Sequence, residues 1–190
     1  VYPEGHPLRY IATSNAPLRA GKGTLYEGGV RVPLIVRWPG KVKSASKTEA
    51  LMSCVDFYPT FLELAQGNKP ENQVLDGFSM CPVWTENRFD PEREVFTHYP
   101  VYHHEQPMSA LRKGDWKIVE NLVSGEFDLF NLKYDVSEMT DLKFSFPGKF
   151  EEMKTALQKW QKDTKAQVPV PNPQYDRAKR YDWGRNPFRK

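Results

Sequence analysis

Long apolar runs are missing from this 190-residue sequence, and no stretch approaches the roughly 20 apolar residues that a membrane-spanning helix needs. A strong charge of one sign is missing too, because 27 basic and 24 acidic side chains leave a net charge of +3. No block of Lys and Arg could follow a phosphate backbone, and the basic end RAKRYDWGRNPFRK is typical of a solvated tail. We therefore expect neither a membrane nor a nucleic acid as partner.

Cysteine is scarce as well. Cys54 and Cys81 are too few for a disulfide framework or a cysteine-based zinc site, and they are compatible with one bridge or with two buried free thiols. The first residues, VYPEGHPLRY, show neither an initiator Met nor a signal-peptide pattern. We expect the chain to be part of a longer polypeptide.

The first half of the chain carries two strong patterns after a loop-like start. The apolar, β-branched run VRVPLIVRWPG (30–40) predicts a strand buried on both faces and ended by Pro39-Gly40. SCVDFYPTFLELAQG (53–67) predicts a helix with Asp56 as N-cap and Gly67 as the glycine at its C-terminal end. A buried strand needs neighbours on both sides, and the sequence offers few candidates upstream.

The pattern changes near residue 90, which divides the chain into a unit of residues 1–90 and a unit of residues 91–190. Four short segments follow, REVFTHY, MSALRKG, DWKIVENLV and EFDLFNL, with turn glycines at Gly114 and Gly125. Beyond them, the apolar residues of GKFEEMKTALQKWQKDTKAQ recur at helical spacing. We expect the end of an α/β layer, then a small antiparallel sheet with one helix packed on it.

A glycine-flanked lysine is the clearest candidate for chemistry. Gly21 and Gly23 let the backbone approach a ligand closely, so that the Lys22 ammonium could face an oxyanion. A surface turn with a solvated lysine fits the same residues. The glycine spacing and the strand that follows do not match a Walker A phosphate-binding loop.

Two long motifs carry a family resemblance. SNAPLRAGKGTLYEGGVRVPLIVRWPG is followed by VDFYPTFLELAQG, and later by THYPVYHHEQPMSALRKGDWKIVE and FDLFNLKYDVSEMTDL. In this order the motifs resemble the C-terminal portion of type I, formylglycine-dependent sulfatases of the alkaline-phosphatase superfamily, over roughly residues 13–165. The resemblance implies the end of an alkaline-phosphatase-like α/β sulfatase domain, followed by the antiparallel-sheet-plus-helix subdomain.

The resemblance also implies roles for individual residues. Lys22 matches the catalytic lysine that binds the substrate sulfate and stabilises its oxyanions as the S–O bond breaks. Glu27 and Arg31 are expected to brace the loop by ion pairing or hydrogen bonding. His98 and His103 match a pocket rim and are candidate substrate-binding residues; the other interpretation is strand-end histidines bonded to backbone carbonyls. A sulfated small molecule or carbohydrate is the implied partner.

Some parts of the family pattern are missing. Neither cysteine lies in the C/S-x-P-S-R motif that yields formylglycine, and the paired aspartates that bind Ca²⁺ are absent. We expect formylglycine and Ca²⁺ to be supplied upstream, assign no metal ligand here, and expect the chain to be inactive without the N-terminal portion of the same protein. The family resemblance implies a periplasmic or secreted location.

Two other functions stay open. A phosphonate or phosphate ester hydrolase of the same superfamily can share the glycine-lysine loop. A non-catalytic, sulfatase-like binding protein would keep the fold without the active centre.

Overall fold

The computed structural model describes residues 14–102 and 105–179, so His103 and His104 lie outside the described residues. The helices are α1 (Glu27–Val30), η2 (Cys54–Asp56), α2 (Phe57–Leu64), α3 (Cys81–Glu86), α4 (Pro147–Thr164) and η3 (Arg177–Lys179). The strands are β1 (Glu94–Tyr99), β2 (Met108–Lys113), β3 (Trp116–Asn121) and β4 (Phe127–Asn131). Across the two described ranges, no helix is both long and apolar enough for a membrane span.

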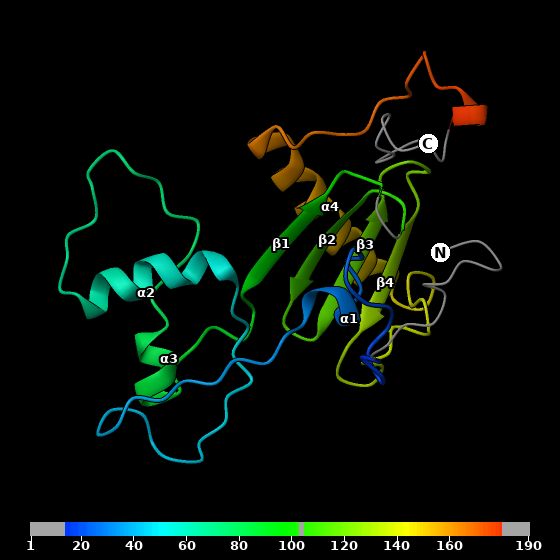
Figure 1. Ribbon diagram of the computed structural model, residues 1–190. Coiled ribbons are helices and arrows are strands. Elements are labelled where there is room, and N and C mark those ends of the chain that lie inside the picture. Colours follow the sequence, from blue (N-terminus) through cyan, green and yellow to red (C-terminus); the bar gives the residue numbers. More distant parts are fainter. Residues whose placement is uncertain (1–13, 103–104, 180–190) are drawn as a thin grey trace, which may run out of the picture.

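The four strands form one antiparallel sheet in the order β1-β2-β3-β4 (Figure 1). Gly114, at the tight turn between β2 and β3, has a φ of +54°, and Gly125, before β4, has a φ of +72°. Both lie in the left-handed region that glycine adopts at no steric cost. The antiparallel meander predicted from the sequence is confirmed.

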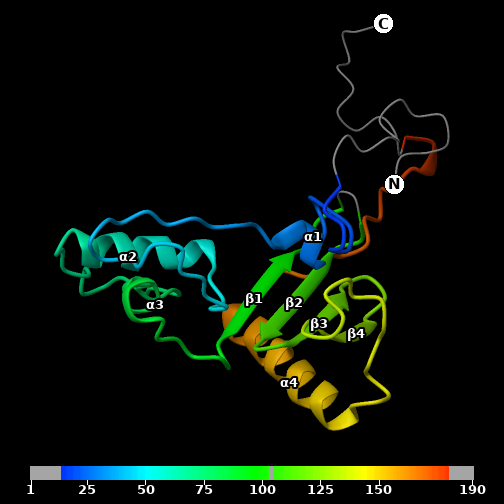
Figure 2. The ribbon, with the colours of Figure 1, turned by 90° about the horizontal axis from the view of Figure 1, so that it is seen from below.

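One face of the sheet is covered by α4, which lies along it in both ribbon views (Figures 1 and 2). Met153 and Leu157 are fully buried on this helix. They contact a cluster of alternating strand residues, namely Leu111, Ile118, Phe127 and Leu129. The predicted helix and its apolar face are thus confirmed, and this layer forms one of the two cores of the sheet.

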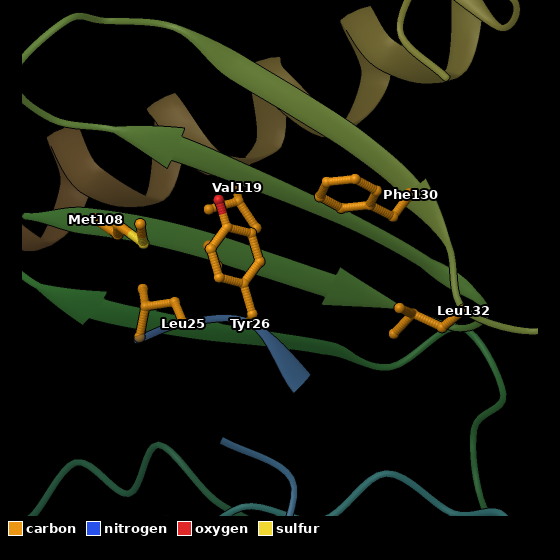
Figure 3. Packing of buried hydrophobic residues seen from close by; sticks show 7 residues of the cluster. Leu25, Tyr26, Met108, Val119, Phe130 and Leu132 are labelled. Carbon is orange, nitrogen blue, oxygen red and sulfur yellow. The ribbon is translucent and has the colours of Figure 1, made fainter. Parts of the chain in front are cut away.

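The opposite face of the sheet is covered by the segment that leads into α1. Leu25 and Tyr26 are buried there against Met108, Val119 and Phe130 (Figure 3). Neighbouring strand residues such as Ile118 and Val119 therefore enter different cores, as the two-residue period of a strand requires. The sheet is buried on both faces, and the segment carrying Lys22 belongs to one of its covering layers.

The helical part with α2 and α3 lies beside the β1 edge of the sheet (Figures 1 and 2). Arg93, just before β1, donates two charge-assisted hydrogen bonds to Asp56, at 2.7 and 2.8 Å. Asp56 also accepts a bond from the backbone N–H of Phe78 at 3.1 Å. Asp56 occupies the N-cap position of α2 as predicted, but its carboxylate gives α2 no capping bond, because Arg93 and backbone N–H groups outside α2 occupy it.

Residues 31–38 form no strand, which corrects the expectation for the run 30–37. Val32 is 78% exposed and Ile35 is 92% exposed. A strand exists only where a neighbouring backbone completes its hydrogen bonds, and among the described residues no strand lies beside this segment. The apolar pattern alone therefore does not make this segment a strand.

The helix expected over 53–67 is present, although its end differs from the prediction. Gln66, not Gly67, has the left-handed backbone, with a φ of +54°. Gly67 instead donates from its N–H to the carbonyl of Leu62 at 2.9 Å. The helix α3 was not predicted from the sequence. Both cysteines are free, with Cys54 exposed and Cys81 buried.

Replacing Leu157 by Ala tests the α4 layer. We expect the free energy of unfolding to fall by about 2–5 kcal/mol, because the change leaves a cavity between α4 and the sheet. Gln158→Ala, at the next and exposed position, is the matched control and should stay within about 0.5 kcal/mol. Denaturant titration followed by tryptophan fluorescence measures both, and equal effects would show that α4 is not packed as described.

Candidate functional site

Lys22 lies in a closed loop of residues 19–28. The N–H of Gly28 donates to the carbonyl of Arg19 at 2.8 Å, and the Thr24 hydroxyl donates to the carbonyl of Gly21 at 2.9 Å. The Lys22 side chain is exposed and forms no ion pair with any residue that the structure describes. The loop therefore presents an ammonium group that the rest of the described protein does not use.

The glycines that close this loop are Gly28 and Gly29 more than the pair that flanks the lysine. A Cβ on Gly28 would lie 2.4 Å from the carbonyl oxygen of Ala20, and one on Gly29 would lie 2.3 Å from that of Thr24. Both contacts are closer than any side chain allows. Gly23 needs glycine for its φ of +90°, whereas a Cβ on Gly21 would meet only the Asn15 side chain at 3.8 Å.

A buried carboxylate anchors the end of the loop to the sheet. Glu27 is 1% exposed, and its side chain contacts Lys117 at 2.9 Å and Arg112 at 3.3 Å. Arg112 and Lys117 are directly opposite each other on β2 and β3. The expected pair with Arg31 is also present, but at 3.8 Å and with an exposed arginine. Glu27 thus braces the loop mainly through β2 and β3.

A second buried carboxylate completes the cluster. Glu138 is fully buried, and its Oε1 contacts Lys117 Nζ at 2.8 Å. Its Oε2 accepts a hydrogen bond from the backbone N–H of Glu27 at 2.6 Å, and its own carbonyl accepts one from Arg19 at 2.8 Å. Sequence reasoning missed Glu138 and Lys117, because charged residues in a polar turn and at a strand start are typical of the surface.

Burial raises the pKa of the Glu138 carboxyl, and the Lys117 ammonium opposes that effect only in part. The nearby Glu27 carboxylate adds to the rise, because two like charges disfavour ionisation. The cluster therefore holds two carboxylates around one buried ammonium, with Arg112 as a further cation at its edge.

The start of the loop is fixed by aromatic packing and by one further bond. The Arg19 guanidinium lies 3.7 Å above the ring of Tyr26, a cation–π contact, and 5.9 Å from the ring of Phe130. The Ser137 hydroxyl donates to the carbonyl of Pro17 at 2.6 Å. Residues 17–19 are thus attached to the same acidic turn that carries Glu138.

Of the two predicted substrate-binding histidines, only His98 lies in the described residues, since His103 is outside them. His98 Nε2 lies 2.7 Å from the carbonyl of Gln167, and Nδ1 lies 3.2 Å from the hydroxyl of Ser109. A carbonyl only accepts, so Nε2 donates the hydrogen of its bond to Gln167. Both ring nitrogens have partners within the chain, and no contact joins His98 to Lys22.

The metal expected upstream has no site in the described part of the chain. Across residues 14–102 and 105–179, no group of three His, Cys, Asp or Glu residues is placed to hold an ion. The carboxylates of Glu27 and Glu138 are engaged with Lys117 and Arg112, so they do not fit a calcium site.

Comparisons with known sequences give a consistent result. A family model described as "N-sulphoglucosamine sulphohydrolase, C-terminal" matches residues 20–167. A "Sulfatase" from Formosa agariphila is 34% identical over 194 residues, covering 89% of this chain and 35% of the relative. Human "Arylsulfatase A" is 41% identical over 101 residues, covering 53% of this chain and 19% of the relative. The chain thus spans about a third, or less, of the length of these relatives.

Solved structures agree. Ps i-CgsB in complex with k-i-k-neocarrahexaose matches with a TM-score of 0.68 and 32% identity, covering 77% of this chain and 32% of that one. BT4656, in complex with its substrate D-glucosamine-2-N,6-O-disulfate, matches with a TM-score of 0.60 and 28% identity, covering 71% and 29%. The predicted fold class, the C-terminal portion of a sulfatase fold, is confirmed.

Removal of the buried ammonium tests the cluster. Lys117→Met should lower the free energy of unfolding by about 3–5 kcal/mol, because it leaves the Glu138 carboxylate buried without its cation and Glu27 with only the more distant Arg112 and Arg31. Lys133→Met is the matched control, since Lys133 is exposed and reaches Asp115 only at 3.9 Å. Denaturant titration measures the free energy of unfolding of both variants. A Lys117 variant as stable as the control would show that the ion pairs of the cluster do not stabilise the fold.

The raised pKa of Glu138 predicts a pH dependence. A carboxyl whose folded pKa is raised contributes stability that is fully present below its ordinary value of 4.5 and is lost as the pH rises through the folded pKa. The free energy of unfolding of the wild type, minus that of Glu138→Gln, should therefore fall as the pH rises from 4.5.

Glu152→Gln is the control with the opposite sign, because a hydrogen bond from Lys149 lowers the pKa of Glu152. For that pair the difference should instead fall as the pH drops below 4.5. Denaturant titrations across a pH series measure both slopes, and a flat Glu138 difference would refute the raised pKa.

Proposed function

This chain belongs to the sulfatase family whose matching model is described as "N-sulphoglucosamine sulphohydrolase, C-terminal", and we propose that it forms part of an enzyme that hydrolyses sulfate esters. In this proposal Lys22 is the catalytic residue that this chain contributes. The ammonium binds the sulfate group of the substrate and stabilises the negative charge on its oxygens while the S–O bond breaks.

The observation that supports the proposal is that Lys22, among the described residues, has a free side chain on a loop whose backbone is held by other residues. Its loop is closed by the bond from Gly28 to Arg19 and tied to the sheet through Glu27, yet the Lys22 side chain is exposed and unpaired within the described residues. A fixed backbone with a free cation suits the binding of an anion, because little order has to be created when the ligand arrives.

The substrate class in this proposal is a sulfated carbohydrate or a smaller sulfated molecule. Support comes from BT4656, whose structure contains its substrate, D-glucosamine-2-N,6-O-disulfate. His98 and His103 stay in the proposal as substrate-binding residues at the pocket rim. For His98 this requires the Gln167 carbonyl to move away from Nε2, since that contact now occupies the nitrogen.

The remaining chemistry is assigned to a preceding portion of the same polypeptide. That portion would supply the formylglycine nucleophile and the calcium ligands, neither of which matches residues of this chain. Packing against it would also cover the exposed apolar side chains of Val32, Ile35 and Phe61. Without it we expect no turnover. A periplasmic or secreted location, implied by the family resemblance, belongs to the same proposal.

Lys22→Ala in the intact protein tests the proposal. We expect turnover of an aryl sulfate ester to fall about 10²–10³-fold, with the melting temperature unchanged, because the loop is held by other residues. Lys159→Ala is the matched control, since Lys159 is an exposed lysine on the outer side of α4 that pairs with Asp163.

Aryl phosphate and phosphonate esters are assayed in parallel. A preference for these esters would favour the phosphate or phosphonate hydrolase, and no turnover of any ester would favour the binding protein. Near wild-type activity of Lys22→Ala would remove Lys22 from the site.

A further inference from the structure

The two ends of the Lys22 loop meet at one residue, Glu138. Arg19, at the start of the loop, donates to the Glu138 carbonyl at 2.8 Å. Glu27, at its end, donates from its backbone N–H to the Glu138 carboxylate at 2.6 Å. Glu138 therefore fixes the base of the loop from a distant part of the sequence.

The backbone of Glu138 is held in an uncommon conformation. Its φ is +52°, in the left-handed region that residues with a side chain seldom adopt, and the residue is fully buried. The turn around it is built by Asp135, whose carboxylate accepts hydrogen bonds from the N–H groups of Met139 and Thr140 at 2.8 and 2.9 Å. Such a conformation persists only where surrounding contacts impose it, and it marks positions where placement matters.

We propose that Glu138 is a positioning residue that sets the place of the Lys22 ammonium through the base of the 19–28 loop. This inference rests on the proposed function, because it assigns to Glu138 the task of aligning the sulfate-binding lysine. Glu138 itself is buried beneath the loop and touches Arg19, Glu27 and Lys117 rather than a substrate.

The physical reason is that Lys22 has no described side-chain partner of its own that could place it. A lysine side chain is long and flexible, so the location of its ammonium depends on where the backbone carries it. If the carboxylate of Glu138 is lost, the N–H of Glu27 loses its acceptor and Lys117 loses one of its two carboxylates. A shift of about 1 Å in a group that stabilises a transition state can cost about 100-fold in rate.

A double-mutant cycle between Glu138 and Lys22 tests the proposal in the intact protein. The wild type, Glu138→Ala, Lys22→Ala and the double variant are assayed for kcat and KM on an aryl sulfate. We expect Glu138→Ala to lower kcat/KM about 100-fold when Lys22 is present, mainly through kcat. With Lys22→Ala in place, the same change should cost about twofold or less, since no ammonium is left to misplace.

Glu138→Gln guards against failure to fold. The glutamine can still accept the Glu27 N–H but carries no charge for Lys117, so it should recover most of the activity that Glu138→Ala loses. Leu157→Ala, on the opposite face of the sheet, is the control: it should lower stability without moving the Lys22 ammonium. It should show no coupling to Lys22, and equal coupling for Leu157 and Glu138 would reduce the effect to general destabilisation.

Two outcomes overturn the proposal. One is a cost of Glu138→Ala, or of the shorter Glu138→Asp where the alanine variant does not fold, that is the same with and without Lys22. The other is an unchanged kcat/KM in a folded Glu138→Ala variant. Amide hydrogen exchange tests, independently of activity, whether Glu138 fixes the base of the loop. The Glu27 and Gly28 amides should exchange faster in Glu138→Ala and not in Leu157→Ala. A wild type that turns over no sulfate ester would refute the proposed function, whereas unchanged exchange would refute the role of Glu138.

Discussion

The buried contact between one ammonium and two carboxylates is the constraint on which the rest of this structure depends. Lys117 lies between Glu27 and Glu138, and none of these charges could remain buried alone, because the loss of water around an ion costs several kcal/mol. The three residues come from the glycine-lysine segment, the sheet and the acidic turn after β4. The ion pairs among these three residues therefore join parts of the chain that lie far apart in sequence.

The fold was predictable where the decisive interactions are local. The hairpins follow from Gly114 and Gly125 at tight turns, and α4 follows from apolar residues at helical spacing, so both agree with the structure. The strand expected at 30–37 was wrong, because strand formation depends on a neighbouring backbone and not on the apolar pattern alone. The left-handed residue at the end of α2 was misplaced by one position, on Gly67 instead of Gln66, because only the backbone geometry distinguishes the two.

The candidate site was predictable only in its exposed part. Lys22 could be identified as a candidate from the sequence, because it matches the lysine of the family motif and is flanked by Gly21 and Gly23. Glu138 and Lys117 carry no local signal, because what distinguishes them is burial beside Glu27, which lies 111 and 90 positions earlier in the chain. Asp56 shows the same limit: in sequence it is a good helix cap, but the guanidinium of Arg93, 37 positions later, takes its carboxylate.

The pairing of β2 with β3 has a consequence for the order of folding. Arg112 and Lys117 face each other across this hairpin, and like charges directly opposite are destabilising. The carboxylate that separates them arrives from a residue 90 positions before Lys117. The β2–β3 hairpin therefore keeps these two like charges unseparated until the segment that carries Glu27 packs against it. The sheet and the loop that carries Lys22 therefore depend on each other. If the loop does not pack against the sheet, Arg112 and Lys117 lack the carboxylate of Glu27. Such a protein would lose stability together with its candidate site.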